Sequence, residues 1–164
     1  MFDVKDLQFV RLTDDKPAFI KPSIINLVPR QLWEQIEDLD RNSIDLIYQS
    51  SFLFDPLNWF VVMHDKEHKV QGFFWAIVCP LERRIVLYAV SISRNYQKYK
   101  TELNKLIMDY LFNLPVKPEY KQLIIAETTK AKALEAHGWM RSKRILMEYR
   151  NVVAESTTTI PTDK

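Results

Sequence analysis

The stretch VSISRNYQKYKTELNKLIMDYL, residues 90–111, joins three patterns without a break. Apolar strand-forming residues run into a basic and aromatic turn, RNYQKYK, and apolar residues then recur at helical spacing from Leu103 to Leu111. A strand that leads directly into a helix N-terminus is a favourable place for a phosphate group. Phosphate loops at such junctions are normally rich in glycine, and this stretch has none. It therefore predicts an unusual cofactor loop, a loop that has lost its cofactor, or a plain connection.

Upstream of this junction, the sequence predicts three strands in a row. The segments are dense in valine, isoleucine and aromatic residues, and the polar turns DKEHK and PLERR separate them. Consecutive strands with short turns predict an antiparallel meander. The segments are WFVVMHD (59–65), KVQGFFWAIVCP (69–80) and RRIVLYAVSIS (83–93).

The first third of the chain predicts one strand and two helices. Residues 7–12 alternate loosely between apolar and polar and predict the strand. From Pro29 onward, apolar residues recur at three- and four-residue spacing, as on one face of a helix. The polar run DRNS (40–43) then interrupts the pattern, and residues 44–52 predict a second short helix.

The last third predicts a strand, a short helix and a final strand. KQLIIAET (121–128) is the strand, and TKAKALEAHGW (129–139) is an alanine-rich helix with Gly138 in the position that ends it. KRILMEYRNVV (143–153) is the final strand. We expect one domain over residues 1–153 and a polar tail over residues 154–164.

The predicted order of elements is β-α-α-β-β-β-α-β-α-β, which places the chain in the α/β (α+β) class. A helix that carries the chain from the end of a meander to a further strand makes a parallel pair. We therefore expect a mixed, mostly antiparallel sheet flanked by helices.

Composition excludes several classes of protein. The chain has 164 residues, 47% of them hydrophobic and 27% charged, which is typical of a folded globular domain. No apolar run approaches the roughly 20 residues that a membrane span needs, so we expect no membrane partner. The 23 basic and 21 acidic side chains nearly balance at a net charge of +2, so we do not expect nucleic acid as a partner.

Cysteine and histidine usage points to a reducing compartment and to no metal. Cys79 is the only cysteine and lies in an apolar run, so it predicts a buried structural thiol. The N-terminus lacks an apolar signal core, and we expect a cytoplasmic protein, in a host cytoplasm or a virion if the source is viral. His64 and His68 have a helical ligand spacing but lie in a hairpin turn, where that geometry is wrong, so no metal site is expected.

This order of elements resembles that of the GNAT N-acetyltransferase superfamily. VQGFFWAIV is similar to the third strand of the family, in which a glycine follows the hairpin, and AKALEAHGWMRSKRILMEYR is similar to the end of the family's domain. The chain has only two glycines, Gly72 and Gly138, and both fall where the family has them. KLIMDYL also resembles the degenerate GNAT-like proteins among the internal virion proteins of short-tailed phages.

The resemblance implies acetyl-CoA as the co-substrate. In the family, backbone N–H groups of the fourth strand face the pantetheine and thioester, and the following loop holds the pyrophosphate. The strand residues in that position are Val90, Ser91, Ile92 and Ser93. The loop residues are Gln97, Lys98, Tyr99, Lys100 and Thr101.

The loop departs from the family's pattern at Lys100 and Glu102, which stand where glycines are expected. One interpretation is that Arg94, Lys98 and Lys100 hold the phosphates by charge in place of backbone contacts. The alternatives are a solvated turn and, less favoured by the net charge, a nucleic-acid contact.

The catalytic groups depart from the pattern as well. Leu134 occupies the position of the tyrosine that acts as the general acid in the family. Tyr88, Tyr96 or Tyr99 would therefore have to protonate the leaving thiolate. Glu127 and Glu82 are the candidate bases. Of these residues, Glu127 and Tyr88 are the predicted catalytic pair.

Two functions follow from the resemblance. The first is an acyl-CoA-dependent N-acetyltransferase in which a small-molecule or peptide amine attacks acetyl-CoA directly. The second is an inactive GNAT-fold binding or structural protein, such as a phage virion component, in which acetyl-CoA binding has been lost. A homodimer is compatible with either.

Overall fold

The structure, a computed structural model, describes residues 3–12, 23–36, 39–51, 56–128, 131–144 and 147–149. The chain divides into two compact units, Met1–Thr129 and Lys130–Lys164, each with its own internal contacts. The assignment of residues 1–153 to one domain stays a prediction.

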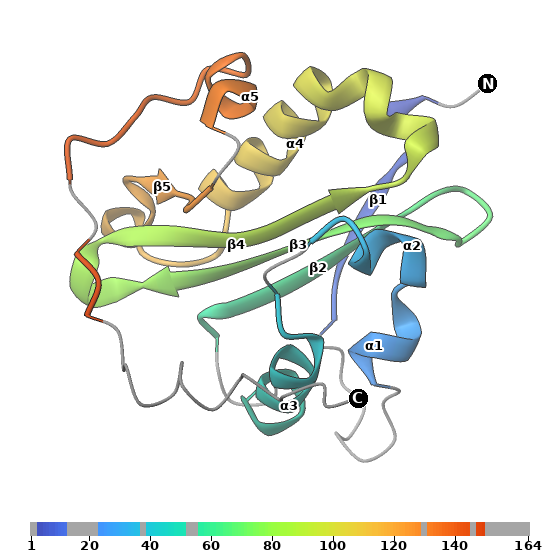
Figure 1. The fold of residues 1–164 in the computed structure, drawn as a ribbon, viewed down its shortest axis with the longest axis horizontal. Helices are drawn as coiled ribbons and strands as arrows, with labels where there is room; N and C mark the ends of the chain where they lie inside the picture. Colours follow the sequence, from blue (N-terminus) through green and yellow to red (C-terminus); the bar gives the residue numbers. More distant parts are fainter. Residues whose placement is uncertain are drawn as a thin grey trace, which may run out of the picture. The chain divides into compact units, whose positions relative to one another are not determined.

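The first unit is built on a five-stranded mixed sheet (Figure 1). The strands lie in chain order, and the first four pair antiparallel, whereas the last pair, β4 with β5, is parallel. The strands are β1 (Gln8–Arg11), β2 (Asn58–His64), β3 (Val70–Cys79), β4 (Arg84–Ile92) and β5 (Ile124–Ile125). The expected mixed, mostly antiparallel sheet is confirmed.

Helices cover both faces of this sheet. Phe73 and Phe74 are neighbours on β3 and therefore point to opposite faces. The face of Phe73 packs against residues of α1 (Ile24–Leu27), α2 (Arg30–Trp33) and α3 (Arg41–Ser51) in one apolar cluster. On the other face, the Phe74 ring lies 5.5 Å from the ring of Tyr110, which belongs to α4 (Lys100–Phe112). The sheet is thus the middle of three layers.

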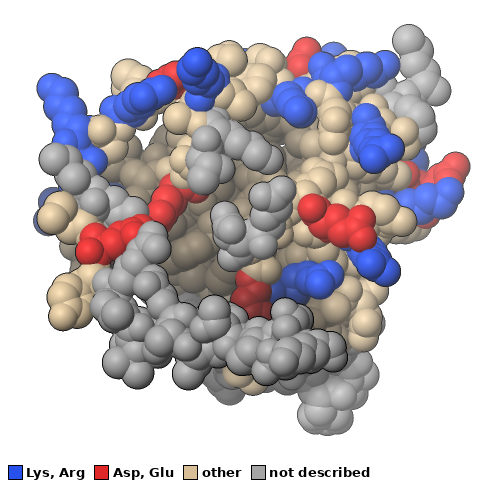
Figure 2. Space-filling view, viewed as in Figure 1, with Lys and Arg blue, Asp and Glu red and all other residues tan. Residues whose placement is uncertain are grey.

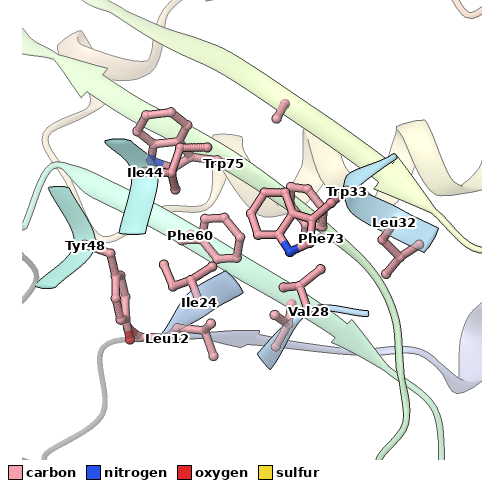
Figure 3. Packing of buried hydrophobic residues seen from close by; sticks show 12 residues of the cluster. Leu12, Ile24, Val28, Leu32, Trp33, Ile44, Tyr48, Phe60, Phe73 and Trp75 are labelled. Atoms are coloured by element: carbon pink, nitrogen blue, oxygen red, sulfur yellow. The ribbon is translucent and has the colours of Figure 1, made fainter. Parts of the chain in front are cut away.

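Stacked aromatic side chains make the core of the α1–α3 face (Figure 3). The rings of Phe60 and Phe73 stack with centroids 5.2 Å apart, and Trp33 packs on Phe73 at 4.8 Å. All three side chains are at most 2% exposed. Burial of such large rings fixes α2 on the sheet and therefore the position of the segment that follows it.

Two short helices differ from their sequence-based prediction. The run DRNS does not interrupt a helix but begins one, because the Asp40 carboxylate accepts hydrogen bonds from the Asn42 and Ser43 N–H groups at the start of α3. The four-residue helix α1 was not predicted, since a segment of one turn shows no periodicity.

The second unit contains α5 (Ala131–Glu135) and the turn that ends it. Gly138 adopts φ +88°, and the Trp139 N–H donates to the Leu134 carbonyl, so the predicted C-terminal glycine of this helix is confirmed. Residues 143, 144 and 147–149 of the predicted final strand are not in a strand, and its other residues lie outside the described part of the chain.

Candidate functional site

Strand β4 parts from β5 after Val86 and bulges at Tyr88. Trp75 pairs with Ala89, but the next residue of β3, Ala76, pairs with Leu87, so Tyr88 is an extra residue in β4. On its other side, β4 pairs with β5 only at Ile85 and Val86. Beyond Val86, no strand of the described part of the chain lies along this edge of β4.

The open edge of β4 carries backbone polar groups. The Ser93 N–H donates to the Gln71 carbonyl on β3 (2.7 Å). Along an antiparallel strand, the backbone N–H and C=O groups of successive residues point alternately to one neighbouring strand and to the opposite side. The N–H and C=O groups of Val90 and Ile92 therefore point away from β3, toward the open edge. The Ile92 carbonyl accepts a hydrogen bond there from the side chain of Gln35 (2.9 Å).

The two serines of this segment are held by their neighbours. The Ser91 hydroxyl is buried and donates to the Leu32 carbonyl at the end of α2 (2.7 Å). The Ser93 hydroxyl donates to the side-chain carbonyl of Gln71 (2.7 Å). Their side chains thus position the end of β4.

A buried amide links this strand end to the β2–β3 hairpin. Gln71 is 9% exposed, accepts from Ser93 and donates to the Asp65 carboxylate (2.7 Å). The other oxygen of Asp65 accepts from the N–H groups of Glu67 and Lys69 (2.9 and 3.0 Å). We call Asp65, Gln71 and Ser93 the polar clamp, because it fixes the end of β4 to the hairpin turn.

The glycine-free loop is a six-residue 3-10 helix, η4 (Arg94–Tyr99), that runs directly into α4. Tyr96 anchors it, with a side chain that is 2% exposed and a phenol whose pKa burial raises. Arg94, Lys98 and Lys100 are exposed, and the Lys98 ammonium lies 4.9 Å from the centre of the Tyr99 ring. The three cations are therefore available at the junction, whereas Tyr96 is a core residue.

The predicted catalytic pair lies where β4 and β5 part. Tyr88 is the bulge residue, is 49% exposed and stacks on Trp75 (4.8 Å). Glu127 is exposed and follows β5 by two residues, beyond the last β4–β5 pair of Val86 with Ile125. Glu82, the other candidate base, lies before the start of β4 and forms an ion pair with Arg84.

A cleft of about 680 Å³ opens at the carboxyl end of β4. Pro29, Leu32 and Val70 give it apolar surface, and its other lining groups are polar. These polar residues are Gln31, Glu34, Gln35, Ser93, Arg94, Asn95 and Gln97. Most of them were not predicted as site residues, because they come from segments far apart in the sequence. The sequence did contain a signal for two of these residues. Gln31 and Gln35 are four residues apart, a spacing that puts side chains on one face of a helix, and they flank the buried residues Leu32 and Trp33.

Charges of both signs are interspersed on the face that Figure 2 shows. Within the described ranges, no group of three or more histidine, cysteine, aspartate or glutamate side chains could hold a metal ion. Nor does any helix of those ranges have the length and apolarity to cross a membrane.

No protein-family model matches the sequence, and no curated protein does. Several solved acetyltransferases share its fold. AAC(6′)-Iy, solved with the bisubstrate analogue CoA-S-monomethyl-acetylneamine, is 11% identical with a TM-score of 0.55, over 88% of this chain and 98% of that one. The aminoglycoside antibiotic 6′-N-acetyltransferase AAC(6′)-Ih from Acinetobacter baumannii is 10% identical with a TM-score of 0.55, over 89% of this chain and 99% of that one. Glucosamine-6-phosphate N-acetyltransferase from Arabidopsis thaliana is 10% identical with a TM-score of 0.52, over 88% of this chain and 99% of that one.

These likenesses extend over most of the chain at low sequence identity, so they concern the fold. The likeness of KLIMDYL to phage virion proteins stays a prediction. With the bulged fourth strand, the parallel fifth strand and the helix between them, the chain has the fold of the GNAT N-acetyltransferases.

Proposed function

We propose that the protein transfers an acetyl group from acetyl-CoA to an amine. The observation that carries this proposal is the open edge of β4, where the backbone groups of Val90 and Ile92 point away from β3 beyond the last pair with β5. Preorganised N–H donors at such an edge suit both an extended amide chain and a thioester carbonyl. The acetyltransferases that share the fold support the same reaction class.

Acetyl-CoA fits the groups present at this junction. Its pantetheine amides would pair with the open edge, and its phosphates would meet Arg94, Lys98 and Lys100, which are exposed beside the N-terminus of α4. Charge would thus stand in for the missing glycines. Gln97, Tyr99 and Thr101 flank these cations, and the polar clamp holds the turn that carries them.

The reaction needs a base and an acid in addition to this binding surface. When acetyl-CoA is bound, the amine nitrogen forms a bond to the acetyl carbon as the carbon–sulfur bond breaks. Glu127 would take the proton that the amine loses, and the Tyr88 phenol would give one to the departing sulfur. Both residues follow the last β4–β5 pair, beside the open edge of β4 along which the thioester would lie.

Calorimetric titration with acetyl-CoA tests the proposal. We expect heat of binding and an increase in melting temperature, because a ligand that binds only the folded state stabilises it. No heat and no thermal shift at millimolar acetyl-CoA would reject the transferase and leave a GNAT-fold protein without its co-substrate.

The contribution of the loop lysines to acetyl-CoA binding can be tested separately. The double substitution Lys98→Ala, Lys100→Ala should weaken acetyl-CoA binding about tenfold, since each exposed charge contributes up to about 1 kcal/mol. Lys105→Ala, an exposed lysine farther along α4, is the matched control and should leave the affinity unchanged. Equal affinities for all three proteins would show that these side chains do not hold the phosphates.

The catalytic pair is tested with an amine that the protein acetylates. Glu127→Gln and Tyr88→Phe should each lower kcat about a hundredfold, the ordinary contribution of a general base or acid, without changing the affinity for acetyl-CoA. Glu119→Gln, an exposed carboxylate on the 3-10 turn before β5, is the control. A kcat that stays at the wild-type value in either variant would remove that residue from the mechanism.

A further inference from the structure

The side chain of Tyr88 is not held by the pairing of the sheet. A bulge leaves one residue of a strand without a partner on the neighbouring strand, so the regular ladder does not set the direction of its side chain. The Tyr88 ring stacks instead on the ring of Trp75, with centroids 4.8 Å apart and an angle of 29° between the planes. Because Tyr88 is 49% exposed, the orientation of its ring depends on the tryptophan against which it packs.

Trp75 is itself fixed in two ways. Its ring belongs to the apolar cluster of the α1–α3 face, together with Phe73 and Ile44 (Figure 3). Its indole N–H donates to the side-chain carbonyl of Asn58 (2.6 Å), and the two residues are 6% and 5% exposed. An indole N–H is a donor only, so one well-placed acceptor determines how the ring is turned within the cluster.

Asn58 is an unusual residue for its position. It is the first residue of β2 and lies opposite Ile77, which packs against the apolar cluster. A buried carboxamide loses its hydrogen bonds to water, and the bond from Trp75 only offsets part of that loss. The Arg11 guanidinium donates to the backbone carbonyl of Asn58 (2.6 Å), which fixes the residue further. The side chain of Asn58 thus orients the indole more than it stabilises the fold.

The proposed role of Tyr88 needs such an orientation. A general acid must lie within hydrogen-bonding distance of the atom that it protonates, and a displacement of about 1 Å can lower a rate about a hundredfold. Asn58 and Trp75 are both buried, so they would influence the reaction through Tyr88 and not by contact with a substrate.

We propose that Asn58 is a positioning residue, which holds the indole of Trp75 and through it the phenol of Tyr88 in the orientation that protonates the leaving sulfur. This assignment rests on the proposed function, because it presupposes that Tyr88 is the acid. The phenol O–H gives its proton to the sulfur as the carbon–sulfur bond breaks, and Asn58 itself exchanges no proton.

Two substitutions of Asn58 separate positioning from stability. Asn58→Leu has a similar volume but no acceptor, so kcat should fall at least about tenfold while the affinity for acetyl-CoA stays unchanged. Asn58→Asp keeps an acceptor oxygen but buries a carboxyl group, so it should lower the melting temperature and leave kcat near the wild-type value. A wild-type kcat in Asn58→Leu would overturn the proposal, and so would a kcat that falls in Asn58→Asp as much as in Asn58→Leu.

A double-mutant cycle tests whether Asn58 acts through Tyr88. In a Tyr88→Phe background, Asn58→Leu should lower kcat by less than about twofold, because the ring no longer has a proton to give. Effects that multiply would indicate a general structural role and overturn the proposal. Tyr48→Phe is the matched control, since it removes another buried hydrogen bond of the same apolar cluster, to the Leu12 carbonyl. It should leave kcat unchanged in both backgrounds.

Nuclear magnetic resonance tests the positioning without turnover. In protein with ¹³C-labelled tyrosine, the ring signals of Tyr88 are those that Tyr88→Phe removes. They should carry a ring-current shift from Trp75, which Asn58→Leu should largely abolish and Tyr48→Phe should preserve. Unchanged Tyr88 signals in Asn58→Leu would show that Asn58 does not hold the ring and would overturn the proposal.

The two proposals fail in different ways. An absence of acetyl-CoA binding would reject acetyl transfer, and with it the catalytic role of Asn58, even if the Tyr88 signals moved as expected. Acetyl transfer that both Asn58→Leu and Tyr88→Phe leave at the wild-type rate would reject the positioning role and leave acetyl transfer standing.

Discussion

At the scale of single residues, Gly72 shows why one position of the sheet admits no side chain. A Cβ atom there would lie 2.6 Å from the Ser91 carbonyl oxygen and 2.7 Å from side-chain atoms of Met63 and Ile92. Since Ser91 and Ile92 belong to the proposed cofactor strand, the glycine lets β3 and β4 approach closely at the site. Its place was predicted from a resemblance, and the close approach gives the physical reason.

Gly72→Ala should therefore be strongly destabilising. We expect a loss of about 1–3 kcal/mol in the free energy of unfolding, the usual cost of forcing extra volume into a packed site, as measured by urea denaturation. Gly138→Ala is the comparison, because nothing lies within 4 Å of a Cβ there and only the positive φ of 88° is unfavourable. A smaller loss for Gly72→Ala than for Gly138→Ala would contradict the steric explanation.

Cys79 should react slowly with alkylating reagents. Burial raises the pKa of its thiol, and the nearby Glu82 carboxylate raises it further, so less of the reactive thiolate is present at pH 8. Iodoacetamide should modify the folded protein more slowly than the same protein in urea, and this single cysteine gives an unambiguous signal. Equal rates in the two states would mean that the thiol is not protected.

At the scale of elements, the long periodic segments were predictable and the short ones were not. β2, β3 and β4 were recognised from their apolar content and polar turns, and α4 from its helical spacing. β5 keeps only two of the eight residues predicted for a strand, because β4 turns away from it after Val86. The start of α3 was hidden by polar residues whose role is to cap it.

The candidate site was predictable to the same extent. The junction of β4 with α4 was visible because it is continuous in sequence. The cleft at the carboxyl end of β4 was not, because residues near α2 and η4 are brought together by the burial of Trp33 and by the bonds from Ser91 to Leu32 and from Gln35 to Ile92. Contacts of this kind depend on the folded arrangement, and no local pattern encodes them.

The turn between β2 and β3 should be sensitive to acid. Although partial burial raises the pKa of Asp65, hydrogen bonds from Gln71 and from the Lys69 and Glu67 N–H groups lower it overall, below its ordinary value of 3.8. The stabilisation is therefore complete above that ordinary value and is lost as the pH falls through the lower pKa of the folded protein.

Urea denaturation over a series of pH values between neutral and about pH 2 measures this effect. The wild-type protein should lose more of its stability below pH 3.8 than Asp65→Asn, whose amide does not titrate. Parallel pH profiles for the two proteins would show that the Asp65 carboxylate contributes nothing through its charge.

At the scale of the whole molecule, the balance of charge limits the choice of partners. A net charge of +2 comes from 23 basic and 21 acidic side chains, and the two signs are interspersed on the face in Figure 2. The cations of η4 are therefore a local feature, suited to a few phosphates. Neutralising a polyanion over many phosphates would require a larger basic surface.

We accordingly expect no binding to duplex DNA at about 0.15 M salt, measured by fluorescence anisotropy of a labelled oligonucleotide. Acetyl-CoA should bind under the same conditions, because it needs only the few cations at the junction. DNA binding that weakens steeply with added salt would contradict this expectation and revive the nucleic-acid interpretation of RNYQKYK.

The brief contact between β4 and β5 also has a kinetic consequence. Two residue pairs and the bond from the Ile85 N–H to the Leu123 carbonyl (2.8 Å) close a long excursion of the chain that includes all of α4. So few interactions make this the part of the sheet that opens most easily. In hydrogen–deuterium exchange, the Ile85 amide should exchange well before the amides that pair β2 with β3. The gap between β4 and β5 beside the proposed thioester site can therefore widen while the rest of the sheet stays paired.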